Sequence, residues 1–417
     1  MLARGVLLLI LLPICGCQRG SEARRPGPPA LDVNSTSLSR TRVVATLDAP
    51  LLPGTNLIWC ASFQLAWKEL AAALKVRQPM VEGSEALCRQ LNAALDPRGY
   101  LSASNYYATA GYLTSDLVDR IRAEVRQKFP TARPLEFGSP PMQNLFAYGY
   151  VEASVPFAIP YINTKQPVAF RESSGKEVKV RTFGIGDKEK RNVWGLRGQV
   201  EVLFGKNLMH RRNDSGEFAV DPFKQSSGVQ LIVACVKPRE TLAATMQNVR
   251  DRAEAIKKAN QEHAPPPPVG SLAPLGPSRT EVTKEEEAKE RVLLPSNPSE
   301  EVQYYPDIND FEAGDTLVIP EMDWHILHHF AELENHLLVT SGAHGPPIIL
   351  AVQDIVFRLD RHGASLRSEA GVAPAGISVP THFEFTKPFL LLLKKRGAEQ
   401  PFFVAWIDNA ELLRRWE

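Results

Sequence analysis

The sequence contains few groups that carry enzymatic or redox chemistry. It has five cysteines in 417 residues and no Cys-x-x-Cys pair, so the common zinc and dithiol motifs are missing. It also has no G-x-S-x-G elbow, H-E-x-x-H motif or glycine-rich phosphate loop. Cys60 and Cys235 lie in apolar runs and are expected to be core thiols. We therefore expect neither an enzyme nor a bound metal or cofactor.

The sequence also lacks an excess of charge of either sign. It has 48 Lys and Arg against 47 Asp and Glu, for a formal net charge of +1. A balanced chain has no overall basic field to attract a phosphate backbone, so nucleic acid is not an expected partner. The hydrophobic content of 44% and charged content of 23% are ordinary for a folded globular chain.

The N-terminal apolar run is too short to cross a bilayer as a helix. Residues 6–12 are apolar and follow the positive charge of Arg4, which is typical of a secretory signal. The next residues, Ile14-Cys-Gly-Cys17, resemble a bacterial lipobox. That resemblance implies cleavage after Gly16, acylation of Cys17, and anchoring of a secreted protein to a lipid bilayer of the bacterial cell envelope. The alternative is a plain signal peptide and a soluble extracellular or periplasmic protein.

Composition predicts three regions. Residues 1–17 form the signal and lipobox, and residues 18–42, rich in Arg, Pro, Gly and Ser, are expected to be a flexible tether. Residues 43–417 are expected to form one domain. A proline-rich and charged insertion at about 259–292 interrupts this domain and is expected to be an exposed loop.

Hydrophobic periodicity predicts helices mainly in the first part of the domain. A largely buried helix is expected over Leu57–Leu74, and an amphipathic one over Ser84–Leu95 because leucines recur every four residues. Asp116–Phe129 is expected to be a third helix, stopped by Pro130. A further helix is predicted over Thr241–Lys258.

Runs rich in apolar and β-branched residues predict strands in the rest of the chain. Ser173-Ser-Gly175 is expected to turn a hairpin, and a second hairpin is expected over Pro388–Asp408. Early helices followed by many such strands favour an α+β fold of helices packed around mostly antiparallel sheets. The predicted strands are 106–112, 144–157, 167–171, 177–180, 229–236, 316–319, 351–359, 389–393 and 402–407.

Three histidines form a cluster in the sequence. His325, His328 and His329 are spaced by three and four residues, and a helix here would place two imidazoles on one face. Such a face could hold a metal ion, but no further ligand motif accompanies it, so we favour surface or partly buried histidines.

Several motifs, in the same order along the chain, resemble those of the serpin family. One group leads into and out of a loop near the C-terminus, and another matches the first core helix and a central strand. The resemblance covers roughly residues 43–409. The motifs are Asn56-Leu-Ile-Trp-Cys-Ala-Ser-Phe63, Thr316-Leu-Val-Ile-Pro-Glu-Met-Asp323, Val356-Phe-Arg-Leu-Asp-Arg-His-Gly363, Phe385-Thr-Lys-Pro-Phe-Leu-Leu-Leu-Leu393 and Phe402-Phe-Val-Ala-Trp-Ile-Asp408.

The resemblance implies an exposed reactive-centre loop and inhibition of serine proteases. In that mechanism a protease cuts the loop, and the N-terminal half of the loop then enters the main sheet as a new strand. Family spacing places the reactive bond at Ile377–Ser378, and an Ile before the cut suits a protease with an apolar specificity pocket. The implied hinge consists of Gly363, Ala364, Ser365, Leu366, Arg367 and Ser368.

The loop sequence alternates in a way that suits a strand. Because side chains in a strand point alternately to two faces, the even-numbered residues 364–372 would share one small or apolar face. Both charges, on Arg367 and Glu369, would lie on the other face. Two features oppose insertion: Leu366 is bulky for a hinge, and Pro374 cannot donate to a ladder. A non-inhibitory interaction or structural module on the same fold is therefore the alternative.

The sequence departs from the family at two places. Members of the family carry a helix across the main sheet at the place that corresponds to 137–145; this chain has only a Gly-Ser-Pro-Pro stretch there, so the helix is expected to be missing. The family tryptophan after the following long strand is also missing, and Phe157 is expected to take its place.

Overall fold

The structure, a computed structural model, describes residues 31–130, 145–186, 193–206, 216–262, 311–312, 314–340, 343–363 and 381–417. The lipobox with Cys17, the stretch 131–144 and most of the predicted insertion therefore lie outside the described residues. Among the residues that are described, no helix is long and apolar enough to cross a membrane.

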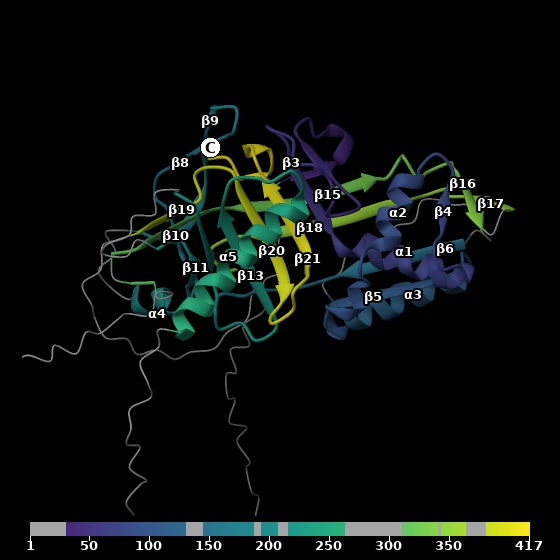
Figure 1. The fold of residues 1–417 in the computed structure, drawn as a ribbon, viewed down its shortest axis with the longest axis horizontal. Helices are drawn as coiled ribbons and strands as arrows, with labels where there is room; N and C mark the ends of the chain where they lie inside the picture. Colours follow the sequence, from purple (N-terminus) through teal and green to yellow (C-terminus); the bar gives the residue numbers. More distant parts are fainter. Residues whose placement is uncertain are drawn as a thin grey trace, which may run out of the picture.

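The fold centres on a seven-stranded sheet built from distant parts of the chain (Figure 1). Its neighbours run antiparallel except for the parallel pair β2–β3 at one edge. The strand order is β11 (Glu201–Phe204), β12 (Phe218–Asp221), β13 (Val229–Cys235), β20 (Phe389–Lys395), β21 (Pro401–Ile407), β3 (Asn56–Cys60) and β2 (Thr41–Val43). The predicted C-terminal hairpin is thus the centre of this sheet.

Two further sheets contain the strands on either side of the segment 364–380 in the sequence. The first has the order β19 (His382–Glu384), β14 (Thr316–Pro320), β10 (Thr182–Ile185) and β7 (Ile162–Asn163). The second has the order β1 (Leu31–Asn34), β15 (Met322–His329) and β18 (Val352–Leu359). In each of them one pair is parallel, β14–β19 and β1–β15, and the remaining pairs are antiparallel.

Three small ribbons complete the described strands. They are β17 (Ala343–Pro347), β16 (Leu337–Thr340) and β4 (Met80–Val81); β5 (Tyr106–Tyr112) and β6 (Leu145–Val151); and β8 (Val168–Arg171) and β9 (Glu177–Val180). The β8–β9 hairpin is the one predicted around Ser173-Ser-Gly175, and Gly175 adopts the positive φ of 84° that its turn needs.

The helices are α1 (Ala61–Leu74), α2 (Glu85–Ala93), α3 (Ser115–Lys128), α4 (Val193–Gly198) and α5 (Leu242–Glu262), with short 3-10 turns η1 (Ser35–Ser37), η2 (Pro97–Gly99), η3 (Ala103–Asn105) and η4 (Ala410–Leu412). The predicted helices at 84–95, 116–129 and 241–258 are confirmed, the last extended to Glu262. The predicted α+β fold with mostly antiparallel sheets is confirmed as well.

The predicted helix over Leu57–Leu74 was wrong at its start. Residues 56–60 form β3, a fully buried strand that pairs with β2 on one side and β21 on the other. A central strand is apolar on both faces and gives a continuous run, which periodicity cannot distinguish from a buried helix. Pairing with β2 and β21 makes residues 56–60 a strand.

The predicted tether over 18–42 was also wrong at its C-terminal end. Residues 31–34 form β1, where polar and apolar residues alternate, and the chain continues through η1 to β2. Two of these short elements are held by strand pairing with β15 and β3, which composition alone does not reveal.

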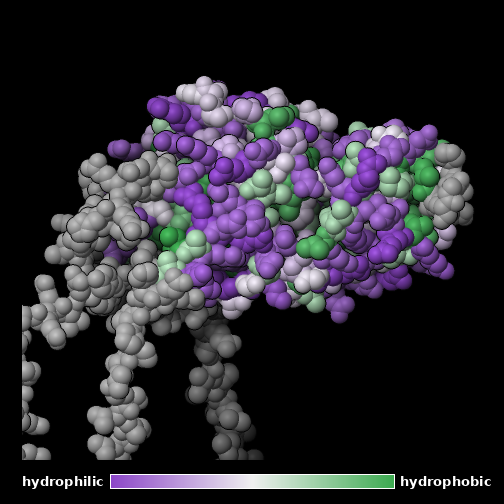
Figure 2. Space-filling model, in the orientation of Figure 1, coloured by the Kyte–Doolittle hydropathy of each residue, from purple (hydrophilic) through white to green (hydrophobic). Residues whose placement is uncertain are grey.

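The buried hydrophobic residues form one large core under these sheets and one small separate cluster, the satellite. The satellite consists of Leu117, Ile121, Val125 and Phe129 of α3, packed on outward-facing aromatic side chains of β5 and β6. The α1 helix contacts β5, β6 and β18. The β5–β6 ribbon is thus enclosed between α1 and α3. Figure 2 shows that the visible surface is mostly hydrophilic, with small separate hydrophobic patches.

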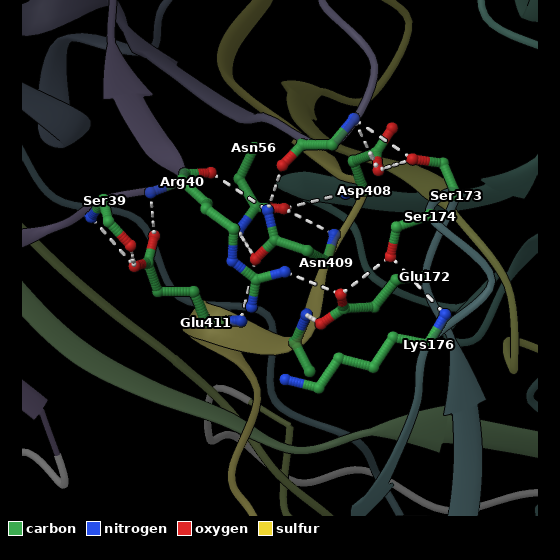
Figure 3. A network of polar contacts seen from close by, with 12 residues as sticks. Ser39, Arg40, Asn56, Glu172, Ser173, Ser174, Lys176, Asp408, Asn409 and Glu411 are labelled. Atoms are coloured by element: carbon green, nitrogen blue, oxygen red, sulfur yellow. Dashed lines mark hydrogen bonds and ion pairs between the residues drawn. The ribbon is translucent and has the colours of Figure 1, made fainter.

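A buried polar network ties the N-terminal segment to the C-terminal one (Figure 3). The side chain of Asn56 accepts hydrogen bonds from the amides of Asp408 and Asn409 at 2.8 and 2.9 Å. The carboxylate of Glu411 accepts bonds from the amides of Ser39 and Arg40, each at 3.0 Å. Because a buried polar group without a partner is costly, each of these bonds supports the packing of the two segments.

Glu172, in the turn of the β8–β9 hairpin, joins the same network. Its carboxylate accepts a 2.6 Å bond from the guanidinium of Arg40 and a 3.2 Å bond from the amide of Ala410. Burial alone would raise the pKa of Glu172, but the bonds from Arg40 and Ala410 outweigh it and lower the pKa below its ordinary value. The ionised form is therefore the one that the fold stabilises.

We expect Glu172→Gln to lower the free energy of unfolding at pH 7 by about 2 kcal/mol, because it leaves Arg40 without its buried partner. A carboxyl with a lowered folded pKa stabilises the fold above its unfolded pKa, and this contribution is lost as the pH falls through the folded pKa. The difference between wild type and variant, measured by urea unfolding, should therefore shrink below about pH 4.5.

The matched control is Glu177→Gln in the same hairpin. Glu177 pairs with Arg171, and both side chains are more than half exposed. Exposed pairs contribute little, so this variant should stay within about 0.5 kcal/mol of wild type. Equal losses from the two variants would contradict the role given to the network.

Candidate functional site

The segment 364–380, which holds the predicted loop, lies outside the described residues, but both of its flanks are described. On the N-terminal side the chain leaves β18 and turns, with the amide of Gly363 donating to the carbonyl of Asp360 at 2.9 Å. Gly363 then forms an antiparallel bridge with Pro156, beyond the end of β6. The chain therefore reverses direction at Gly363, and the backbone there points back along β18.

Glycine is required at position 363 by geometry. Its φ is +69°, in the left-handed region. A Cβ atom there would lie 2.5 Å from the amide nitrogen of Phe157 and 2.6 Å from the carbonyl oxygen of Val155. Phe157 is buried beneath this turn and packs against Tyr161 and Phe183 at ring-centroid distances of 4.9 and 6.0 Å. Phe157 is therefore part of the core, and its correspondence to the family tryptophan stays a prediction.

On the C-terminal side the segment is tied to a buried carboxylate. The amide of Thr381 donates to Asp315 at 2.7 Å, and the carbonyl of Thr381 accepts from the amide of Thr316 at 3.0 Å. The next residues form β19, which pairs in parallel with β14 over three residue pairs. This short edge strand fixes the second end of the segment.

The Asp315 carboxylate is completely buried and lies near a buried lysine. The ammonium of Lys206 is 4.0 Å from Asp315 and 3.2 Å from Glu312. Burial raises the pKa of Asp315, while hydrogen bonds from the amides of Thr381 and Glu312 and the charge of Lys206 oppose that rise only in part. Asp315 thus fixes the position of Thr381. The amide donors offset part of the free-energy cost of burying the Asp315 carboxylate.

Near the first flank, two strands each have an edge that is unpaired among the described strands. Among the described strands, β6 pairs only with β5, and β18 pairs only with β15 and not with β6. Both β6 and β18 run toward the Pro156–Gly363 bridge, so their C-terminal ends point to the same junction. A strand placed between them would run antiparallel to both.

The N-terminus of α1 forms a common floor for both strands. Gly149 of β6 lies so close to it that a Cβ atom would overlap the carbonyl oxygen of Ser62. From β18, the side-chain amide of Gln353 donates to the Cys60 carbonyl and to the Ser62 hydroxyl, each at 2.9 Å. The two strands therefore meet the same helix turn without pairing with each other.

Gln353 has one further property. Its side-chain oxygen is buried and has no hydrogen-bond partner within the described part of the chain. A buried acceptor without a donor costs about 1–3 kcal/mol. The side-chain oxygen of Gln353 can therefore accept a hydrogen bond on the inner face of β18.

The predicted site residues divide between described and undescribed parts. Gly363 is at the chain reversal where the hinge was expected to begin. The other predicted site residues lie outside the described residues, so their roles stay predictions. They are Ala364, Ser365, Leu366, Arg367, Ser368, Ile377 and Ser378. Sequence reasoning missed Gln353 and Asp315, because neither belongs to a short motif and both act through contacts with distant residues.

The possible helix around His325, His328 and His329 was wrong. All three lie in strand β15, where Trp324 and Ile326 face the core and His325 and Leu327 face outward. The period of two in this stretch favours a strand over a helix. Within the described residues no group of His, Cys, Asp or Glu has the geometry of a metal site.

Comparison with known proteins gives matches among solved structures alone. No family model and no curated protein matches the chain. The structure is similar to human thyroxine-binding globulin complexed with its hormone (10% identity, TM-score 0.42, covering 85% of this chain and 92% of that one). It is also similar to tengpin, a thermophilic serpin (8%, 0.43, 90% and 99%), and to human kallistatin (11%, 0.42, 86% and 92%).

The solved structures that this fold resembles are serpins, the family whose motifs the sequence resembles. With identities near a tenth and TM-scores below 0.5, the similarity carries no argument about the activity of this chain.

We expect Gly363→Ala to lower the free energy of unfolding by about 2–4 kcal/mol, because the new Cβ meets two backbone atoms at a left-handed φ. The control is Gly175→Ala, which has a similar φ of 84° but no atom within 4 Å of the new Cβ. That variant should lose only about 1 kcal/mol in the same denaturant titration. Equal costs would show that contact with the Val155–Phe157 backbone is unimportant.

We expect Asp315→Ala to loosen the second end of the segment. Removing the acceptor of the Thr381 amide should raise hydrogen exchange at residues 381–384 by roughly tenfold, the effect of one buried hydrogen bond. The reciprocal variant is Asp360→Ala, which removes a side-chain acceptor of the His362 amide at the first end. It should leave residues 381–384 unchanged; faster exchange there in both variants would refute separate anchoring.

Proposed function

We propose that the chain is a serpin-like inhibitor of serine proteases that acts by loop cleavage and strand insertion. The observation that carries this proposal is the arrangement of β6 and β18, two unpaired strand edges over one floor, with the loop leaving from their junction at Gly363. A strand between them would satisfy backbone groups on both edges.

The turn at Asp360–Gly363 suggests the register of the inserted strand. If the chain continued from this turn as a hairpin, Ala364 would lie opposite Leu359, and the pairing would proceed one residue at a time. Leu366, Ser368 and Ala370 would then lie opposite Phe357, Ile355 and Gln353. These three residues of β18 face the core, so the small and apolar side of the loop would be the buried one.

The same register would place the charged side of the loop toward solvent. Arg367 would lie opposite Val356, which is exposed, and diagonal to Asp354. Glu369 would lie directly opposite Asp354, a like-charge pair that costs about 0.2–1 kcal/mol at an exposed position. The diagonal Arg367 offsets this cost.

Two local features favour insertion in this register. Ser368 would be diagonal to Gln353, and its hydroxyl could donate to the unpaired side-chain oxygen of that residue. Pro374 would fall beyond the start of β18 at Val352, so its missing N–H would not interrupt the ladder.

The energetics support insertion after cleavage. Strand β18 has eight residues, and a new strand pairs with it on one side and with β6 on the other. With about 1 kcal/mol net for each ladder bond, roughly eight new bonds provide about 8 kcal/mol. These bonds, together with burial of the inner face, have to outweigh the like-charge cost and the entropy of ordering the inserted residues, about 1–2 kcal/mol for each residue.

Cleavage at Ile377–Ser378 would release the N-terminal part of the loop, and Ile377 would select a protease with an apolar pocket. In the same proposal, an acylated Cys17 anchors the inhibitor to the bacterial cell envelope. The alternative function is a non-inhibitory interaction or structural module, favoured by Leu366, whose bulk would meet Phe357 and slow insertion.

The decisive experiment pairs a protease challenge with two loop variants. The soluble domain is incubated with an elastase-like protease, and we expect a denaturant-stable covalent complex. After cleavage the inhibitor should melt roughly 10 °C higher, because the inserted strand adds ladder bonds. Rapid turnover without any rise in melting temperature would support the non-inhibitory alternative.

The variants test the register itself. Ser368→Arg places a charge on the inner face and should abolish both the complex and the rise in melting temperature. Ser365→Arg places the same charge on the outer face and should leave both intact. Identical behaviour of the two variants would contradict the register and, with it, the proposed insertion.

A further inference from the structure

The strand β1 occupies an unusual place in the fold. It pairs in parallel with β15 along four residues and with no other described strand, so it is an edge strand. On its other side, β15 pairs with β18 along eight residue pairs. A contact that joins β1 to both β15 and β18 therefore strengthens the attachment of this edge strand to the sheet.

His325 forms such a tie at the centre of the three strands. Its Nδ1 atom lies 2.7 Å from Oδ1 of Asp32 in β1, and its Nε2 atom lies 2.5 Å from Oδ1 of Asp354 in β18. The imidazole is mostly covered, with 13% of its side chain exposed, while both carboxylates are about half exposed. One ring thus contacts one carboxylate on each side.

This geometry requires a particular protonation state. An ionised carboxylate only accepts hydrogen bonds, and a neutral imidazole has one donor and one acceptor nitrogen. A neutral ring would therefore bring a lone pair against one of the two carboxylates. Only the imidazolium, with a proton on each nitrogen, satisfies both contacts. Histidine is the side chain whose charge changes between about pH 5 and 8.

The other charged groups on this face have partners outside β1. On the same face, Asp323 of β15 is paired with Arg358 of β18 at 2.8 Å, and His329 contacts a single carboxylate, Glu334, at 3.0 Å. From the neighbouring ribbon, Tyr148 approaches Asp354; burial above all, and then the charge of Asp354, raises the pKa of this phenol.

A second contact between the same elements is independent of pH in this range. Ser35, just after β1, bonds to Nδ1 of His328 at 2.8 Å. Burial, and then the charge of His329, lowers the pKa of His328 to about 4, so this ring is neutral from pH 5 to 8. The contact between Ser35 and His328 therefore serves as an internal reference for the contacts of His325.

We propose that His325 with Asp32 and Asp354 is a pH-dependent clasp that holds β1 in the sheet when the imidazole is charged and loosens β1 when it becomes neutral. The clasp acts on the first described strand. The inference does not depend on protease inhibition, because each contact joins elements outside the loop.

The test is hydrogen exchange of the full-length protein, expressed as protection factors so that the intrinsic pH dependence of exchange is removed. Amides of residues 32–34 should lose protection by about fivefold between pH 5.5 and pH 8, as two partly exposed ion pairs are lost. In His325→Gln this pH dependence should vanish. Asp32→Asn should remove most of this pH dependence. Asp354→Asn is a second variant, which removes the other, exposed carboxylate that His325 contacts.

The control is His329→Gln, on the same face of β15 but paired with a carboxylate outside β1. It should keep the wild-type pH dependence at residues 32–34, and amides of β20 should report an intact core in every variant. The proposal is overturned if protection of β1 is flat with pH in the wild type, or if its pH dependence survives in His325→Gln.

Discussion

The backbone groups on the edges of β6 and β18 that are unpaired among the described strands impose the main constraint on this structure. Strand edges expose N–H and C=O groups that other strands can complete, and natural sheets usually cover or block such edges. Here the two edges lie over the N-terminus of α1, and Gly149 and Gln353 bring both strands to Ser62. Strand β6 is enclosed between α1 and α3, and β18 is fixed to β15, so the edges are held in place.

The described residues on both sides of the segment 364–380 are held firmly in the fold. The Gly363 turn fixes one end against the core around Phe157, and the buried carboxylate of Asp315 fixes the other at β19. The large sheet, with its C-terminal hairpin and the polar network around Asn56 and Glu172, provides the rigid support. The proposed insertion depends on these two fixed ends and on the unpaired edges of β6 and β18.

The sequence predicts most elements of this fold and only part of the site. Amphipathic stretches such as 116–129 were located correctly because their burial is one-sided and periodic. Strand β3 was mistaken for the start of a helix because it is buried on both faces, and β1 and β2 were assigned to a tether because pairing, not composition, orders them. Gly363 could be predicted from a motif, whereas Gln353, Asp315 and His325 depend on contacts between residues far apart in the chain.

The most direct measurement of the central claim is the structure of the chain after a single cut at Ile377–Ser378. The account predicts a new strand between β6 and β18, antiparallel to both, with Ser368 opposite Ile355 and its hydroxyl at the side-chain oxygen of Gln353. A cut chain in which β6 and β18 keep their unpaired edges, or pair directly with each other, would contradict it.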